Sequence, residues 1–392
     1  MTEQHAPKRD KYIDLLFIGL VVSFAVSLST AQIFAGLLLV TAFLNVKSRW
    51  YAREVKIMAT LSFSYVILLT VISGINDGLM GILEGLHHTW TVTTGFSVAV
   101  LWPRFTFQKK FEIWIYPFVV AAVWYLVQYI WFGYSDVWKY GFHRAPYIFA
   151  ILLIAPSLYM ITINPPTKLE SVIWIVFVTS IMALNSRGAI LAWLVATLLI
   201  LSKYTFHYLL HRRAVWAFVG VILCFFFFAA PSRWVKFDLA AHSSVRHRLV
   251  VWSEAIKAIG DKPMLGYGFK KFHPDYRVVK PEYQDYLRFE SNPHNGYLMV
   301  LHATGVAGYI VMWTIYGSLA LILIRQFRYD RTDRISLVAA ANLLAIFVAS
   351  LLDKTFFTTL PIFQAWSLAG LAVTRSALSN PNRDLKEETD SE

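Results

Sequence analysis

The sequence predicts an all-α polytopic membrane protein with about twelve transmembrane helices and one large helical loop. Of its 392 residues, 57% are hydrophobic and only 15% are charged, which is more apolar surface than one soluble core needs. Apolar runs of about 18 to 22 residues recur along the chain. At 1.5 Å per residue, each run is long enough to cross a hydrocarbon core about 30 Å thick.

The first apolar run follows a polar, basic start at residues 1–11 and leads at once into a second run. It lacks a small-residue cleavage site, so we expect a retained helix rather than a signal peptide. The single cysteine, Cys224, cannot form an internal disulfide. The predicted spans are, in order, 12–30, 31–46, 57–75, 88–103, 113–132, 146–164, 171–185, 188–202, 214–230, 305–324, 335–352 and 356–374.

The distribution of basic residues predicts the orientation of these spans. With the N-terminus inside, most of the 36 Lys and Arg residues fall in cytoplasmic segments, and the short outer loops hold only Lys139, Arg144, Arg187 and Lys354. This asymmetry follows the positive-inside rule and predicts that both termini are cytoplasmic. The net charge of +12 is therefore mostly a topology signal, and no nucleic-acid partner is expected.

The spans predict one membrane domain with one outer insertion. Residues 1–230 would form the first nine membrane helices, and residues 231–304 an outer loop that ends in an interfacial helix. Residues 305–375 would form the last three membrane helices, and residues 376–392 a cytoplasmic tail. No internal repeat is visible in the sequence.

Arg187 interrupts an apolar stretch, 171–202, that is too long for one span. Asn185-Ser186-Arg187-Gly188 is expected to break this stretch into a helical hairpin, with the break at the outer surface. An arginine at a membrane edge needs a partner. Its planar guanidinium suits a lipid phosphate; the alternative is that it extends to the lipid headgroups without a catalytic role.

His294 is placed at the start of an apolar helix by Ser291-Asn292-Pro293-His294-Asn295-Gly296. Asn292 is a suitable N-cap and Pro293 a suitable first residue, so we expect His294 in the first helical turn. A neutral imidazole there could act as a general base. The alternative is a histidine that only caps an interfacial helix.

A helix from Pro293 to Ile324 would be roughly 48 Å long, which exceeds the thickness of the bilayer. Gly305-x-x-Gly308 is the natural position for a break. Residues 293–304 would then lie at or above the interface, and 305–324 would span. Small residues at this spacing also allow close helix packing.

The outer loop contains further candidate site residues. Arg248 and Trp252 would share one face of a helix, and Arg246 adds positive charge. The glycine-rich turn Pro263–Phe269 lacks the strand and the third glycine of a nucleotide site.

Metal binding is not predicted. The histidines His87, His88 and His143 lie in or next to the expected outer loops 76–87 and 133–145, but adjacent His87 and His88 would point to different sides of a helix. The sequence has no H-E-x-x-H motif, cysteine pair or P-loop.

Taken together, these motifs resemble those of bacterial O-antigen ligases. His294-Asn295, followed after nine residues by Gly305-Val306-Ala307-Gly308-Tyr309, is similar to the outer-face motif of the O-antigen ligase and polymerase superfamily. Asn185–Gly188, Arg248-x-x-x-Trp252 and Pro263-x-x-Gly266-x-Gly268 occur in the order that the superfamily shows.

The resemblance implies a GT-C-like, membrane-embedded glycosyltransferase of the inner membrane with a periplasmic active site. The implied donor is O-antigen on undecaprenyl diphosphate, and the acceptor is a sugar hydroxyl of lipid A–core, so the product is lipopolysaccharide. No metal or other cofactor is implied. His294 would be the general base, and Arg187, Arg248 and Arg246 would bind the diphosphate. Supporting residues would be Asn295, Trp252, Gly305 and Gly308.

Two alternatives remain, an enzyme of the same superfamily and a transporter from another class of function. An O-antigen polymerase shares much of this layout. A transporter for an anionic substrate should show internal repeats and broken helices near the midplane, whereas the charged residues here are predicted at the outer edge. The sequence therefore favours an enzyme over a transporter.

Overall fold

The structure, a computed structural model, describes residues 11–48, 52–104, 114–140, 146–163, 166–184, 186–202, 244–269, 293–330, 333–353, 355–357 and 359–379. Within these ranges every regular element is a helix, which confirms the all-α prediction. The predicted span 214–230 lies outside the described residues.

Thirteen α-helices are described, with short 3-10 turns at Val46–Ser48, Trp90–Val92, Trp102–Arg104 and Thr355–Phe357. The helices are α1 (Lys11–Val26), α2 (Leu28–Asn45), α3 (Arg53–Thr89), α4 (Thr93–Leu101), α5 (Tyr116–Tyr140), α6 (Pro146–Leu152), α7 (Ile154–Thr162), α8 (Lys168–Ala183), α9 (Arg187–Leu201), α12 (Ser244–Asp261), α14 (Gly296–Tyr329), α15 (Arg334–Ser350) and α16 (Thr359–Ser379).

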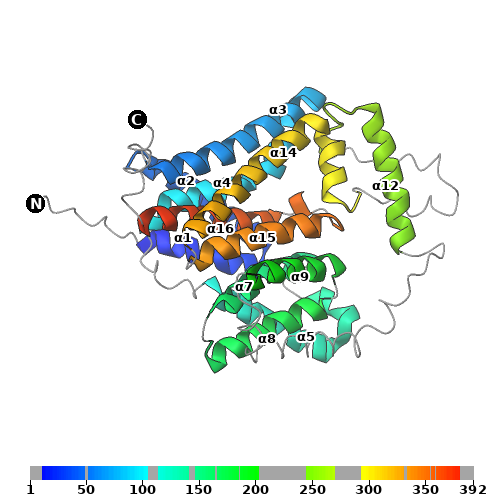
Figure 1. Cartoon of the computed structure of the whole chain (residues 1–392). Coiled ribbons are helices and arrows are strands. Elements are labelled where there is room, and N and C mark those ends of the chain that lie inside the picture. Colours follow the sequence, from blue (N-terminus) through cyan, green and yellow to red (C-terminus); the bar gives the residue numbers. More distant parts are fainter. Residues whose placement is uncertain are drawn as a thin grey trace, which may run out of the picture.

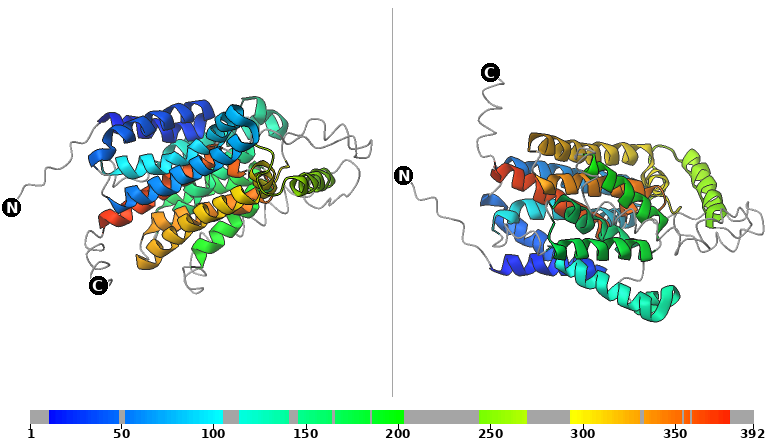
Figure 2. Two further views of the ribbon diagram at one scale, coloured as in Figure 1. Left: turned by 90° about the horizontal axis from the view of Figure 1, so that it is seen from above. Right: turned by 60° about the horizontal axis from the view of Figure 1, so that its bottom comes forward.

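Helices α15 and α16 lie in the middle of the bundle. α16 packs on α4, α15 packs on α9 and α14, and the two also pack on each other. Phe363 and Trp366 of α16 are fully buried between these neighbours. Figure 1 shows α3 and α14 on one side of the central pair and α7, α8 and α9 on the other, while α12 crosses one end of the bundle; Figure 2 shows α12 at the same end from two further directions.

The outward sides of the bundle carry large exposed apolar side chains, as a lipid-facing surface requires. Examples are Leu15, Ile33, Leu44, Ile67, Val120 and Ile130. Within the described residues, three stretches are long and apolar enough to cross a membrane by length and composition: Leu28–Asn45, Arg53–Leu101 and Gly296–Tyr329. Each predicted span except 214–230 overlaps a described helix. The count of twelve crossings stays a prediction.

Helix α3 is a tight hairpin rather than one straight helix. The backbone leaves helical geometry at Asp77 and Gly78, and Gly78 has a φ of 58°. Beyond this turn the chain runs back along itself, because a Cβ at Gly85 would lie 2.8 Å from the Cα of Thr70. The side chain of Ser62 likewise donates to the carbonyl of Val92 at 3.1 Å.

The predicted outer loop 76–87 is therefore wrong in length. The turn consists of Asp77 and Gly78, and the residues from 79 onward are already helical. At Gly81 the second arm passes so close to the first that a Cβ would collide with the carbonyl of Ser73. Glycine allows the two arms to approach closely enough for a two-residue connection.

Helix α14 is also interrupted, at the position that the sequence predicts. Gly305 has φ 61° and ψ −166°, a conformation that is nearly restricted to glycine. The break separates a short outer segment, Gly296–Thr304, from the long segment that follows. Figure 1 shows the outer segment bending away from the rest of α14 toward α12. Gly308 packs closely on α3, where a Cβ would lie 3.2 Å from Leu69.

Candidate functional site

Arg187 is the first residue of α9, directly after the break between α8 and α9. Ser186 caps the helix, and its hydroxyl accepts a hydrogen bond from the amide of Ala189 at 3.4 Å. The break predicted at 185–188 is thus confirmed, although Asn185 lies outside the described residues. The side chain of Arg187 is exposed.

Asn295, not Asn292, caps the outer segment of α14. Its side-chain oxygen accepts hydrogen bonds from the amides of Tyr297 and Leu298, at 3.0 and 3.1 Å. The expected place of His294 in the first turn is therefore wrong, because His294 precedes the cap. Asn292 lies outside the described residues. Two amide contacts through one side chain define the start of the helix at Gly296.

The backbone at His294 has a left-handed conformation, with a φ of 46°. Among the residues that the structure describes, it is the one non-glycine residue with a positive φ. Histidine tolerates this region better than most residues. The imidazole is half-buried, so it retains access to solvent at the end of the bundle.

The outer end of α15 connects the two predicted site segments. Asn295 donates from its side-chain nitrogen to the carbonyl of Leu351 at 3.0 Å. On the other side, a Cβ at Gly188 would lie 3.4 Å from the side chain of Leu352. Asn295, next to His294, and Gly188, next to Arg187, thus contact two consecutive residues, Leu351 and Leu352. The segments that carry His294 and Arg187 therefore approach the same end of α15, although they lie far apart in the sequence.

Trp252 ties α12 to the segment that carries His294. Its indole nitrogen donates to the carbonyl of Pro293 at 2.8 Å. Arg248 lies one turn earlier on the same helix and is half-buried. The shared face predicted for Arg248 and Trp252 is confirmed, since both belong to α12. The side chain of Arg246 lies outside the described part of α12.

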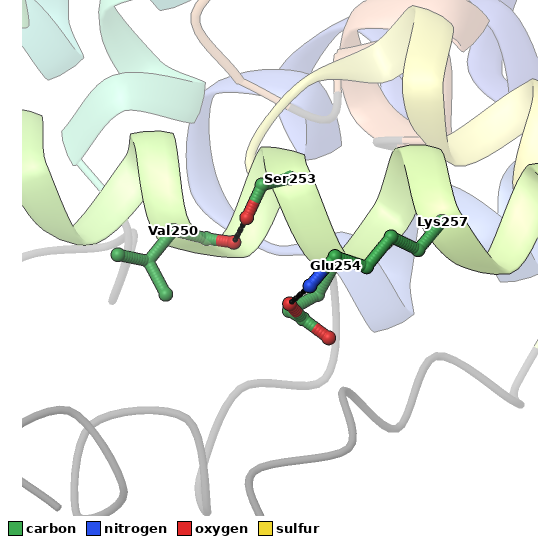
Figure 3. A network of polar contacts seen from close by, with 4 residues as sticks. All are labelled: Val250, Ser253, Glu254 and Lys257. Atoms are coloured by element: carbon green, nitrogen blue, oxygen red, sulfur yellow. Dashed lines mark hydrogen bonds and ion pairs between the residues drawn. The ribbon is translucent and has the colours of Figure 1, made fainter. Parts of the chain in front are cut away.

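Local contacts support the helical form of α12. Figure 3 shows two of them: the Ser253 hydroxyl donates to the carbonyl of Val250 at 2.8 Å, and Lys257 pairs with Glu254 at 2.7 Å. Both contacts join residues three positions apart, so they lie within one helix. Interactions with the bundle must therefore fix the orientation of α12.

Residues 263–268, here called the clamp turn, come one residue after the end of α12 and fill the break in α14. At a helix break, amides and carbonyls lose their helical partners, and the clamp turn supplies replacements. The four hydrogen bonds run from Tyr267 N to His302 O (2.8 Å), Gly268 N to Ala303 O (2.8 Å), Val306 N to Pro263 O (2.8 Å) and Ala307 N to Met264 O (3.1 Å).

Glycines make this contact possible. Gly266 and Gly268 have φ values of 70° and 90°. A Cβ at Gly266 would lie 2.5 Å from the carbonyl oxygen of His302, and a Cβ at Gly305 would collide with the backbone of Met264. The glycine-rich turn of the sequence is thus a packing motif against α14.

Three further residues at this end of the bundle were not among the predicted site residues. Asn76, at the tip of the α3 hairpin, donates to the carbonyl of Leu265 in the clamp turn at 2.8 Å. Ser350 is fully buried against Gly296. Asp353 is half-buried and directly follows Leu352. The signal for Asp353 was a charged residue between the last two apolar spans, while Asn76 gave none beyond its polarity.

His87 and His88 of α3 lie beside Phe269, the residue that follows the clamp turn. The ring of His88 is 5.1 Å from that of Phe269, and the rings of His87 and His88 are 5.2 Å apart. Among the described residues, His, Cys, Asp and Glu form no group of three that could hold a metal ion.

Comparison with known families adds independent evidence. Residues 172–313 match the family model described as O-antigen ligase. This match, which covers about a third of the chain, supports the resemblance to the O-antigen ligase superfamily. The family is membrane-embedded and implies a glycosyltransferase-like activity, ligase or polymerase, on polysaccharide or lipid-linked substrates. No curated protein gives a significant match to the chain.

The O-antigen ligase match begins in α8 and ends in the long segment of α14. It therefore contains Arg187, Arg248 and His294, together with the clamp turn and the break at Gly305. The α3 hairpin and the outer end of α15 lie outside the matched residues. They nevertheless contact the matched region through Asn76 and Leu351.

Proposed function

We propose that this protein is an O-antigen ligase. It transfers O-antigen from undecaprenyl diphosphate to a sugar hydroxyl of lipid A–core and so completes lipopolysaccharide. The observation that carries the proposal is the shared attachment of the Arg187 and His294 segments to the outer end of α15, through Gly188 and Asn295. A cation and a base at one place suit the transfer of a glycan from a diphosphate.

Arg187 and Arg248 stabilise the leaving group in this mechanism. As the bond between the anomeric carbon and the diphosphate breaks, negative charge develops on the diphosphate oxygens. Guanidinium groups bind such oxygens through two parallel hydrogen bonds and need no protonation step. Arg246 adds a further positive charge to the same helix, α12. No metal ion is required for this charge stabilisation.

His294 activates the acceptor in this mechanism. A sugar hydroxyl is a weak nucleophile, and it attacks more readily when a base removes its proton in the transition state. The acceptor oxygen forms a bond to the anomeric carbon while the bond to the diphosphate breaks, and the proton passes to the imidazole of His294. One displacement of this kind inverts the configuration at the anomeric carbon.

The proposed location is the inner membrane of a bacterium, with a GT-C-like fold, both termini in the cytoplasm and the active site facing the periplasm. Support comes from the charge asymmetry of the loops. Residues 231–304 then form the periplasmic part. This orientation suits a lipid-linked donor, which needs no nucleotide at the site.

Lipopolysaccharide profiles of a deletion strain test the proposal. Loss of a ligase leaves lipid A–core without any O-antigen, while polymerised glycan accumulates on the lipid carrier. The alternative, an O-antigen polymerase, predicts lipid A–core that bears a single repeat unit in the deletion strain. That second profile would contradict the proposal. An unchanged profile would contradict both assignments.

A further inference from the structure

The clamp turn has contacts on two sides. Its four backbone hydrogen bonds join it to the break in α14, as described above. On the opposite side it meets the tip of the α3 hairpin, where Asn76 donates from its side-chain nitrogen to Leu265 O at 2.8 Å and to Ile72 O at 3.3 Å. One carboxamide thus links a membrane helix to the outer turn.

The direction of α12 depends on this turn. α12 ends at Asp261 and the clamp turn begins two residues later, so the C-terminal end of α12 cannot move independently of the turn. The middle of α12 is held a second time, by Trp252 on the carbonyl of Pro293. Two fixed points define the direction of a helix, and Arg248 and His294 lie next to the second point.

We propose that Asn76 is a positioning residue, which holds the clamp turn on the α3 hairpin and so fixes Arg248 relative to His294. This inference rests on the proposed transferase function, and it assigns Asn76 no contact with substrate. Loss of the carboxamide leaves every proposed catalytic group in the chain. It removes one hydrogen bond that holds α12 in place.

Steady-state kinetics of the purified full chain test the effect on the reaction. We expect Asn76→Ala to lower kcat and to raise the KM for the lipid-linked donor, each by about fivefold, because Arg248 is no longer held in place for the diphosphate. A simple loss of folded enzyme would lower kcat alone. Asn76→Asp keeps the shape but loses the N–H donor, so it should behave like Asn76→Ala. Asn76→Gln retains a donor and should recover part of the activity.

Asn45→Ala provides a matched control. Asn45 also donates from its carboxamide to a helix carbonyl, that of Thr41 at 2.7 Å, but both residues belong to α2. We expect wild-type kcat and KM for this variant. Wild-type values for Asn76→Ala or Asn76→Asp would overturn the proposed role of Asn76.

A distance measurement tests the positioning without any enzymatic readout. Spin labels at Ser253→Cys on α12 and Leu83→Cys on the α3 hairpin, both exposed positions, are introduced into a Cys224→Ser chain. We expect one narrow distance distribution, which Asn76→Ala broadens and Asn45→Ala leaves unchanged. An unchanged distribution in Asn76→Ala would overturn the inference. A well-folded wild-type chain without transferase activity would overturn the proposed function instead.

Discussion

His294 combines an unusual backbone conformation with contacts on both sides. Its φ of 46° is rare for a residue with a side chain. The residue before it is held by Trp252, and the residue after it is held by Leu351. A left-handed residue persists only where its surroundings fix it, and such residues gather at functional sites. These contacts hold the backbone of His294 in place at the end of the bundle.

The proposed base role predicts that His294→Ala lowers glycan transfer by about a hundredfold or more, because a general base typically contributes at least this factor. EDTA should leave the wild-type rate unchanged. Transfer by purified protein measures both effects. His87→Ala serves as the control, since His87 is exposed on the α3 hairpin and has no assigned role. Full activity of His294→Ala would remove this residue from the mechanism.

Residue types in the sequence were enough to find several site positions, but not their geometry. Asn292-Pro293 matched the pattern of a helix start, yet Asn295 is the cap. Both asparagines suit that position. Asn295 also bonds to Leu351, a residue 56 positions away in the chain, and such long-range contacts are not visible in a local pattern. Asn76 was missed for the same reason.

At the scale of elements, the length of each apolar stretch was the most reliable guide to where a helix is interrupted. An unbroken helix from Pro293 to Ile324 exceeds the bilayer, and the break does occur at Gly305. The stretch 171–202 is likewise too long, and it does divide before Arg187. The α3 hairpin shows where this approach fails. Gly81 and Gly85 let its two arms pack closely, so the turn needs only two residues. Most of the polar residues expected in the loop 76–87 are therefore helical.

The break in α14 predicts the effect of adding one methyl group. Gly305→Ala should lower the free energy of unfolding by about 3 kcal/mol or more, because the backbone conformation is strained for alanine and the methyl collides with Met264. The change is measured as the apparent Tm in detergent, with size-exclusion chromatography as the readout of folded protein.

Gly317→Ala is the matched control for this prediction. Gly317 belongs to the same helix, and a methyl group added there would meet no neighbouring atom within 4 Å. Alanine favours helix over glycine by about 1 kcal/mol, so this variant should unfold at the wild-type temperature or slightly above. An equal decrease in the apparent Tm of both variants would show that α14 tolerates no added methyl group and that the break has no special role.

At the scale of the whole molecule, composition and charge predicted the fold class, and the regular elements of the described residues are all helices as expected. The motif order also led to the family that the comparison identifies. Composition could not predict how the helices pack. The central position of α15 and α16 depends on side-chain fit among many apolar residues, and apolar patterns on most of these helices look alike.

The topology predicts which positions a reagent can reach from outside. In a Cys224→Ser chain, Ser253→Cys on α12 should react with a membrane-impermeant maleimide on the periplasmic side of intact inner membranes. Ser202→Cys, at the opposite end of α9, should react only after permeabilisation. Both serines are exposed and bond within their own helix, to Val250 and Leu199. The reverse labelling pattern would contradict the proposed orientation of the chain in the membrane.

The clamp turn has a consequence for changes in chain length. Surface loops usually tolerate insertions, because few of their backbone groups have partners in the protein. Here four successive hydrogen bonds fix the register between residues 263–268 and residues 302–307. One inserted residue would shift that register, and the amides and carbonyls at the break in α14 would lose these partners. This connection therefore has the sequence length of a loop and the register constraint of a paired strand.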